Sequence, residues 1–256
     1  MPEMQSNAFK HAIAQGKLQI GLWSSLCSNI AAEVISDSGF DWILLDTEHS
    51  PNEIPDLVTQ LQAVQRGTAT PIIRPAWNDA VMAKRALDIG AQTLLFPYVQ
   101  NVEEAKRAVA STRYPPQGIR GVSVAARASR YGRVPDYLTK ANDEICVLVQ
   151  VETQAALDNI EAICAIEGID GVFIGPADLH ASMGYPGEIA NPKVKPRIDE
   201  AIRRIRKCGR APGILTPNEA DARHWLECGA LFVAVGADVG ILARGAESLA
   251  DKFKSK

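Results

Sequence analysis

Short apolar segments recur along the chain, and most of them are followed by a stretch in which apolar residues return at helical spacing. The eight segments with the length of a strand are Gln19–Ser24, Asp41–Asp46, Pro71–Arg74, Thr93–Pro97, Ile145–Val151, Gly171–Gly175, Pro212–Thr216 and Leu231–Gly236. Most are continuous apolar runs, as expected for parallel strands buried on both faces. Strands that alternate with helices predict an α/β fold, and eight strands predict a closed (β/α)₈ barrel, the TIM-barrel fold.

Polar residues mark where helices between these strands begin and end. Asp79, after Asn78, predicts the start of a helix that ends near Gly90. Asn101 predicts the start of the next helix, and Asn218 opens a later one that Gly229 terminates. Asn and Asp are favoured at helix N-termini, and Gly is favoured just past helix C-termini. The capping pattern therefore supports helices between the strands.

One connection is longer than the others. Ser111 to Glu144, between the fourth and fifth predicted strands, is rich in Gly, Pro and Arg. Long connections at the C-terminal face of a barrel usually cover an active site. We therefore expect this segment to cover the mouth of the barrel, with a solvated excursion as the alternative.

Length and composition add bounds to this fold. The 256 residues fit one barrel domain spanning 1–256, since such barrels contain about 250 residues. A net charge of −3 gives no electrostatic case for nucleic acid. No apolar run approaches the roughly 20 residues that cross a membrane, and the N-terminal segment lacks the apolar core of a signal peptide. Five cysteines without a CxxC pair fit thiols in a reducing compartment, so we expect a cytoplasmic protein.

Polar residues gather where the apolar strands end. In a barrel these ends converge on one mouth. The residues placed there are Trp23, Asp46, Thr47, Glu48, His49, Arg74, Gln150, Glu152, Gly175, Pro176, Ala177 and Asp178. Because they come from several separate strands, they predict a site built on a rigid scaffold.

Two carboxylates among these residues suggest a metal ion. Glu152 and Asp178 follow neighbouring strands, and two carboxylates leave about four positions of an octahedral ion for water and substrate oxygens. This pattern favours Mg²⁺ or Mn²⁺ over zinc, since neither His nor Cys joins the pair at an evident spacing. Either carboxylate could instead be a helix cap.

His49 and Arg74 are candidates for proton transfer and charge stabilisation. His49 alone among the four histidines follows a predicted strand end directly, and a histidine can act as a base near neutral pH. His180 could line the same mouth. Arg74 could bind an anionic oxygen, pair with Asp46 or Glu48, or do both. No lysine stands at a predicted strand end, so imine chemistry is disfavoured.

These residues lie in segments that resemble a known family across nearly the whole chain. The segments include LLDTEHSPN, PIIRPAWND, LDIGAQTLLFPYVQN, ICVLVQVET, EGIDGVFIGPADL and APGILTPN. In combination they are similar to the HpcH/HpaI family of pyruvate-dependent class II aldolases. The resemblance implies reversible aldol cleavage of 4-hydroxy-2-oxo acids, such as 4-hydroxy-2-oxoheptanedioate, to pyruvate and an aldehyde.

The resemblance also implies roles for individual residues. Glu152 and Asp178 match metal ligands for Mg²⁺, Mn²⁺ or Co²⁺. His49 matches the base, Arg74 matches the group that stabilises the enolate, and Asp88 matches an acid that acts on the histidine from a neighbouring subunit. The residues implied to bind the substrate are Trp23, Gln150, Gly175, Pro176, Ala177, Asp178 and, on the aldehyde side, Leu215. A homo-oligomer, a hexamer, is implied.

Three positions depart from the family pattern, and they leave the substrate open. Thr47 replaces a more usual Gly, Ser123 interrupts a Gly-Val-Gly pattern, and His180 replaces a more usual Ser. None removes a catalytic group. The rival hypotheses are the same chemistry on a 2-keto-3-deoxy sugar acid, a CoA-dependent C–C lyase on this barrel, and a non-enzymatic sensor of 2-oxo acids.

Overall fold

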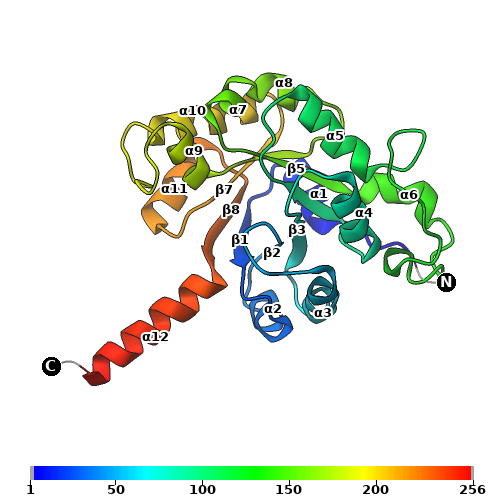
Figure 1. The fold of residues 1–256 in the computed structure, drawn as a ribbon, viewed down its shortest axis with the longest axis horizontal. Helices are drawn as coiled ribbons and strands as arrows, with labels where there is room; N and C mark the ends of the chain where they lie inside the picture. Colours follow the sequence, from blue (N-terminus) through cyan, green and yellow to red (C-terminus); the bar gives the residue numbers. More distant parts are fainter. Residues whose placement is uncertain (1–2, 255–256) are drawn as a thin grey trace.

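The computed structural model describes residues 3–254 and contains a closed barrel of eight parallel strands, which pair in chain order (Figure 1). The strands are β1 (Gln19–Ser24), β2 (Trp42–Asp46), β3 (Thr70–Arg74), β4 (Thr93–Phe96), β5 (Cys146–Val151), β6 (Gly171–Ile174), β7 (Ala211–Leu215) and β8 (Phe232–Ala237). The predicted (β/α)₈ barrel is confirmed, and every predicted strand limit lies within one residue of the observed one. The expected extent of the domain, 1–256, stays a prediction.

Most of the helices surround the barrel, and α1 closes one of its ends (Figure 1). They are α1 (Ala8–Ala14), α2 (Asn29–Ser36), α3 (Ile54–Val64), α4 (Ala80–Asp88), α5 (Val102–Thr112), α6 (Tyr137–Glu144), α7 (Gln154–Asp158), α8 (Ile160–Cys164), α9 (Pro176–Ser182), α10 (Lys195–Lys207), α11 (Glu219–Cys228) and α12 (Asp238–Lys254). The predicted caps are confirmed. Asp79, Asn101 and Asn218 accept backbone N–H groups at the starts of α4, α5 and α11. Gly229 ends α11 with a φ of 109°, a conformation that favours glycine.

The inside of the barrel is a packed aromatic core. Trp42 and Phe232 lie edge to face with ring centroids 6.1 Å apart, and Phe9 of α1 contacts both rings. Gly213 of β7 leaves room for this packing, because a Cβ there would lie 2.2 Å from the Phe232 ring. Phe9 is fully buried, so α1 closes the end of the barrel where the strands begin. The interior is therefore solid, and a ligand can approach only from the other end.

The long connection lies at the opposite end from the one expected. Because α5 follows β4, the segment from 113 to 136 comes after a helix, and α6 joins it to the start of β5. It packs against the C-terminal end of α4, where Arg120 Nη2 lies 2.8 Å from Asp88 Oδ1 and Arg127 donates to the carbonyl of Ile89 at 2.6 Å. The end of α4 leads into the start of β4. The prediction that this segment covers the mouth is therefore wrong.

α12 departs from the barrel instead of packing on it (Figure 1). Asp238 is its one buried residue. Val239, Leu242, Leu249 and Phe253 recur at spacings of three, seven and four residues along one side of the helix, and all are exposed. None of the helices in the described part of the chain is long and apolar enough to cross a membrane.

Candidate active site

Arg74, the last residue of β3, stands at the centre of the polar mouth. Its Nε and Nη2 donate to the two carboxylate oxygens of Asp46 at 2.8 and 2.7 Å, and its Nη1 lies 2.7 Å from Glu48 Oε2. The guanidinium carbon lies 4.9 Å from the ring centroid of Trp23 on β1. The ion-pair reading of Arg74 is thus confirmed with both carboxylates. The planar fork is held in one orientation from three sides.

The ion pairs of Arg74 affect the pKa values of Asp46 and Glu48 at the end of β2. Burial raises the pKa of Asp46, but the hydrogen bonds and charge of Arg74 outweigh it, so the net pKa lies below its usual value. Burial raises the pKa of Glu48, and neighbouring Asp46 and Asp178 add to this despite the opposing charges of Arg74 and His49. Asp46 is therefore the firm anionic partner of Arg74, and Glu48 is the carboxylate that more readily takes up a proton.

Glu152, just past β5, is buried and held in place by two donors. Its Oε1 accepts the backbone N–H of Tyr98 at 2.8 Å, and its Oε2 accepts Gln150 Nε2 at 2.5 Å. Gly175 leaves the space that this carboxylate needs, since a Cβ there would lie 2.3 Å from Glu152 Oε2. The Tyr98 contact was missed by sequence analysis. Its only signal was the place of Tyr98 just beyond the fourth predicted strand.

The electrostatics around Glu152 fit a cation. Burial, followed by the charges of Asp178 and Glu48, raises its pKa to about 7, although the hydrogen bonds from Gln150 and Tyr98 oppose the shift. Asp178 lies exposed in the first turn of α9. Gln150 Oε1 is buried without a partner. Glu152 and Asp178 offer carboxylate oxygens, which are the ligands that hard divalent ions prefer.

Within one chain, His49 and Asp88 lie at opposite ends of the barrel. His49 is exposed beyond β2, with its Nε2 3.9 Å from Glu48 Oε2. Asp88 ends α4 beside the start of the barrel and pairs with the buried Arg120. The two residues therefore do not meet within one chain. The implied role of Asp88 requires the mouth of a neighbouring subunit.

The departures from the family pattern have local structural roles. Thr47 donates its hydroxyl to the carbonyl of Arg74 at 2.6 Å and ties the end of β2 to β3. His180 is buried inside α9, where its Nδ1 lies 2.6 Å from the carbonyl oxygen of Pro176, so it does not line the mouth. Ser123 lies in the connection at the other end of the barrel, away from the strand ends. Leu215 is half-buried at the end of β7.

Asp238 was not singled out by sequence analysis. It is buried at the start of α12 and accepts the hydroxyl of Ser24 at 2.9 Å and the N–H groups of Ser25 and Leu26 at 2.8 and 3.2 Å. These bonds hold the segment that follows Trp23. Its place after the eighth predicted strand was the available signal.

The fold and this mouth define a (β/α)₈ barrel with its polar groups at the strand C-termini, where barrel enzymes carry their active sites. The chain belongs to the HpcH/HpaI aldolase/citrate lyase family, which it matches over residues 19–245.

Individual relatives cover almost the whole chain. It is 57% identical over 249 residues to the 4-hydroxy-2-oxo-heptane-1,7-dioate aldolase of Klebsiella pneumoniae subsp. pneumoniae, covering 97% of this chain and 94% of that protein. The crystal structure of a family protein from Burkholderia cenocepacia J2315 superposes with a TM-score of 0.94 at 37% identity and covers 97% of this chain and 100% of that one. An HpcH/HpaI aldolase from Desulfitobacterium hafniense DCB-2 gives a TM-score of 0.88 at 25% identity over 96% of each chain.

Proposed function

We propose that the protein cleaves 4-hydroxy-2-oxo acids reversibly into pyruvate and an aldehyde, with 4-hydroxy-2-oxoheptanedioate as substrate. The observation that carries the proposal is the 57% identity, over almost the full length of both chains, with a protein named for this aldolase activity. Arg74 at the mouth supports it, because an oxo acid carries an anionic oxygen of the kind that a guanidinium binds.

A divalent ion is the cofactor in this proposal, with Glu152 and Asp178 as its ligands and Mg²⁺, Mn²⁺ or Co²⁺ as the ion. When bound, the ion supplies Lewis-acid polarisation of a substrate oxygen. The buried Glu152, whose pKa is raised to about 7 by burial and by the nearby carboxylates, supports a cation at this place. Gln150 and the segment Gly175, Pro176, Ala177 and Asp178 bind the pyruvyl unit beside it.

Side chains of the protein accept the substrate proton and stabilise the negative charge that forms during cleavage. His49 takes the proton of the 4-hydroxyl group, directly or through water, and the bond between C3 and C4 breaks. The electron pair moves onto the pyruvyl unit and gives an enolate with its negative charge on the 2-oxygen, which Arg74 stabilises. Carbon C3 then takes up a proton, which gives pyruvate. Asp46 keeps the guanidinium aimed at the mouth through two hydrogen bonds. Trp23 flanks the same guanidinium, and Leu215 lines the aldehyde side.

The proposal includes a homo-oligomer, a hexamer, in which Asp88 of one subunit serves His49 of another. Two observations support association. Asp88 lies at the far end of the barrel from the mouth of its own chain, and α12 exposes an apolar side that nothing in the described chain covers. An uncovered apolar row of this kind supports a contact with another protein surface.

A metal-controlled aldehyde screen tests the function. The protein is depleted of metal, refilled with single divalent ions and incubated with pyruvate and a panel of aldehydes. We expect succinic semialdehyde, the four-carbon product of heptanedioate cleavage, to be consumed faster than sugar aldehydes. A preference for sugar aldehydes would favour the 2-keto-3-deoxy sugar acid alternative. Full activity after exhaustive chelation, or trapping of pyruvate by borohydride, would overturn the metal-dependent scheme.

A further inference from the structure

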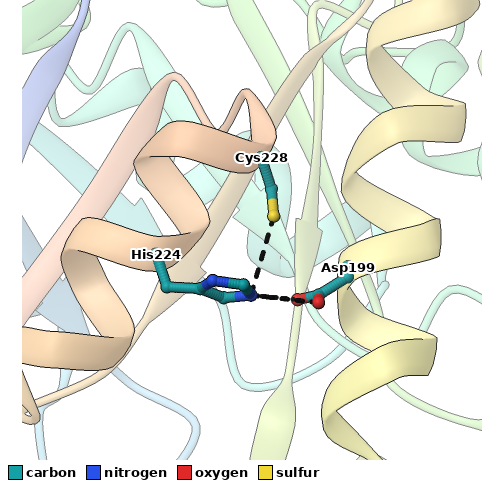
Figure 2. Close-up of side chains that lie close together, drawn as sticks. All are labelled: Asp199, His224 and Cys228. Atoms are coloured by element: carbon teal, nitrogen blue, oxygen red, sulfur yellow. Dashed lines mark hydrogen bonds and ion pairs between the residues drawn. The ribbon is translucent and has the colours of Figure 1, made fainter.

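A second group of metal-ligating side chains lies outside the mouth, between α10 and α11 (Figure 2). His224 and Cys228 are one helical turn apart on α11, and Asp199 faces them from α10. Their ligand atoms all lie within 4.8 Å of one another, and all three residues are half-buried. The mechanism above uses none of them.

One nitrogen of His224 faces both of its neighbours. Nε2 lies 2.9 and 3.0 Å from the two oxygens of Asp199 and 3.7 Å from Cys228 Sγ. A Cys–His–Asp catalytic arrangement needs the carboxylate on one ring nitrogen and the thiol on the other. The geometry here is different, because the nitrogen, the sulfur and the oxygens converge on one point.

The spacing of these atoms suits a tetrahedral ion. Bonds of about 2.0 Å to nitrogen and about 2.3 Å to sulfur, at a tetrahedral angle, separate the two ligands by roughly 3.5 Å. The observed separation of Nε2 and Sγ is 3.7 Å. The nitrogen and the carboxylate oxygens, at 2.9 Å, need to open by only about 0.4 Å to reach the corresponding separation. Small side-chain rotations would therefore admit an ion.

Neighbouring groups prepare the ligands. Trp225 Nε1 donates to Asp199 Oδ1 at 3.1 Å, which orients the carboxylate, while Oδ2 faces His224 Nε2 at 3.0 Å. Arg203 Nη2 lies 3.4 Å from Cys228 Sγ, and its charge opposes the rise in the pKa of this thiol that burial and Asp199 cause. A thiolate and a carboxylate together carry two negative charges, which balance a divalent cation. Outer contacts of this kind raise the affinity of a site.

We propose that Asp199, His224 and Cys228 form a binding site for Zn²⁺ that clips α10 to α11, with water as the fourth ligand. Imidazole and thiolate ligands select zinc over magnesium and manganese, whereas the all-oxygen set of the mouth selects the opposite way. The two sites therefore hold different classes of ion. The clip joins the helices on either side of β7, so its effect is on the stability of this side of the barrel.

Cobalt distinguishes the two sites directly. Metal-depleted protein is titrated with Co²⁺, and the near-ultraviolet band of charge transfer from thiolate to cobalt is followed. We expect this band in the parental protein and in Glu152→Gln, which alters the oxygen site. Cys228→Ser and His224→Ala should lose the band while their circular dichroism stays parental. Cys208→Ser, which replaces another half-buried cysteine at the end of α10, is the matched control and should keep the band.

Zinc binding gives a second readout. We expect Zn²⁺ to raise the melting temperature of the parental protein and of Glu152→Gln, but not of Cys228→Ser, with binding at least about tenfold weaker in Asp199→Asn. Absence of the thiolate band in the parental protein overturns the proposal. Retention of the band in Cys228→Ser, or its loss in Cys208→Ser, assigns the ion elsewhere and also overturns it.

Discussion

At the scale of single residues, the function of Arg74 depends on its planar fork. The fork makes two hydrogen bonds to Asp46 and an ion pair with Glu48. We expect Arg74→Lys to lower turnover by about 10²–10³, because a point charge cannot replace these contacts and still face the oxyanion. The measurement is the exchange of pyruvate methyl protons with solvent in the absence of aldehyde. Arg223→Lys, on an exposed pair of α11, is the control. Exchange at the parental rate in Arg74→Lys would refute the role assigned to Arg74.

Removing the acidic group at Glu152 should change how stability depends on pH. The folded-state pKa of about 7 lies above the ordinary value of 4.5, because burial and nearby carboxylates disfavour the charge. The metal-free fold therefore loses stability as pH rises from 4.5 to 7, by about 3 kcal/mol. Glu152→Gln should abolish this loss, since Gln150 can turn its amide and offer its unpartnered Oε1.

The check on Glu152 is a pair of denaturant titrations between pH 5 and pH 8 on metal-free protein. The difference in stability between the parental protein and Glu152→Gln should favour the variant increasingly toward pH 8, and a divalent ion should reverse the order. A difference that does not vary with pH would show that the pKa of Glu152 is not raised in the folded protein.

The sequence placed the side chains of this site better than it placed their partners. Arg74 and Glu152 were predicted at the mouth because they follow apolar strands, and the structure has them there. The N–H of Tyr98 is a backbone group that carries no signal of its own, yet it holds Glu152. The pair of Asp88 with Arg120 joins residues 32 positions apart through a connection without regular period. Contacts of that kind depend on the tertiary path of the chain.

At the scale of elements, Gly175 joins β6 to α9 and determines where Glu152 can lie. A Cβ at this position would lie 2.3 Å from Glu152 Oε2 and 2.8 Å from its Cβ. We expect Gly175→Ala to displace the carboxylate and weaken divalent metal binding by about 10–100-fold, as disturbances around metal ligands typically do. Gly236→Ala on β8 is the control, because its new Cβ would meet only Leu22 at 3.5 Å. Calorimetric titration with Mn²⁺ measures the difference. Equal affinities in the two variants would show that the carboxylate does not ligate.

Helices and strands could be predicted from the sequence where a local pattern of residues determines their limits. Buried parallel strands are apolar throughout, so their limits were found within one residue. The long connection was misplaced because α5 was not given its C-terminal limit, and a segment after a helix lies at the opposite end from one after a strand. α1 was missed as the plug of the barrel. Its role depends on Phe9 reaching Trp42 and Phe232, and the sequence around Phe9 does not reveal such long-range contacts.

At the scale of the whole molecule, a shared active site predicts complementation between inactive variants. His49→Ala and Asp88→Ala should each be impaired, the first by about 10²–10⁴. If Asp88 serves a neighbouring subunit, a one-to-one mixture reassembled from dissociated subunits contains sites with both native residues. Random pairing restores about a quarter of the sites. The assay is aldol cleavage by the reassembled mixture. Activity no greater than the mean of the two variants would place Asp88 outside the site.

The path of α12 makes the assembly itself testable. Val239, Leu242, Leu249 and Phe253 lie along one side of a helix that leaves the barrel, and each is exposed within one chain. In a monomer, Leu242→Glu with Leu249→Glu would be almost neutral, because both side chains already face water. If this side of the helix packs on a second copy, the two charges would be buried in an apolar contact and the oligomer should dissociate. Ser248→Glu is the control, since position 248 lies roughly 140° around the helix from the apolar row. Light scattering measures the mass, and cleavage activity should decline with it because Asp88 no longer reaches a neighbour. An unchanged mass in the double variant would mean that the exposed row is not the contact between subunits.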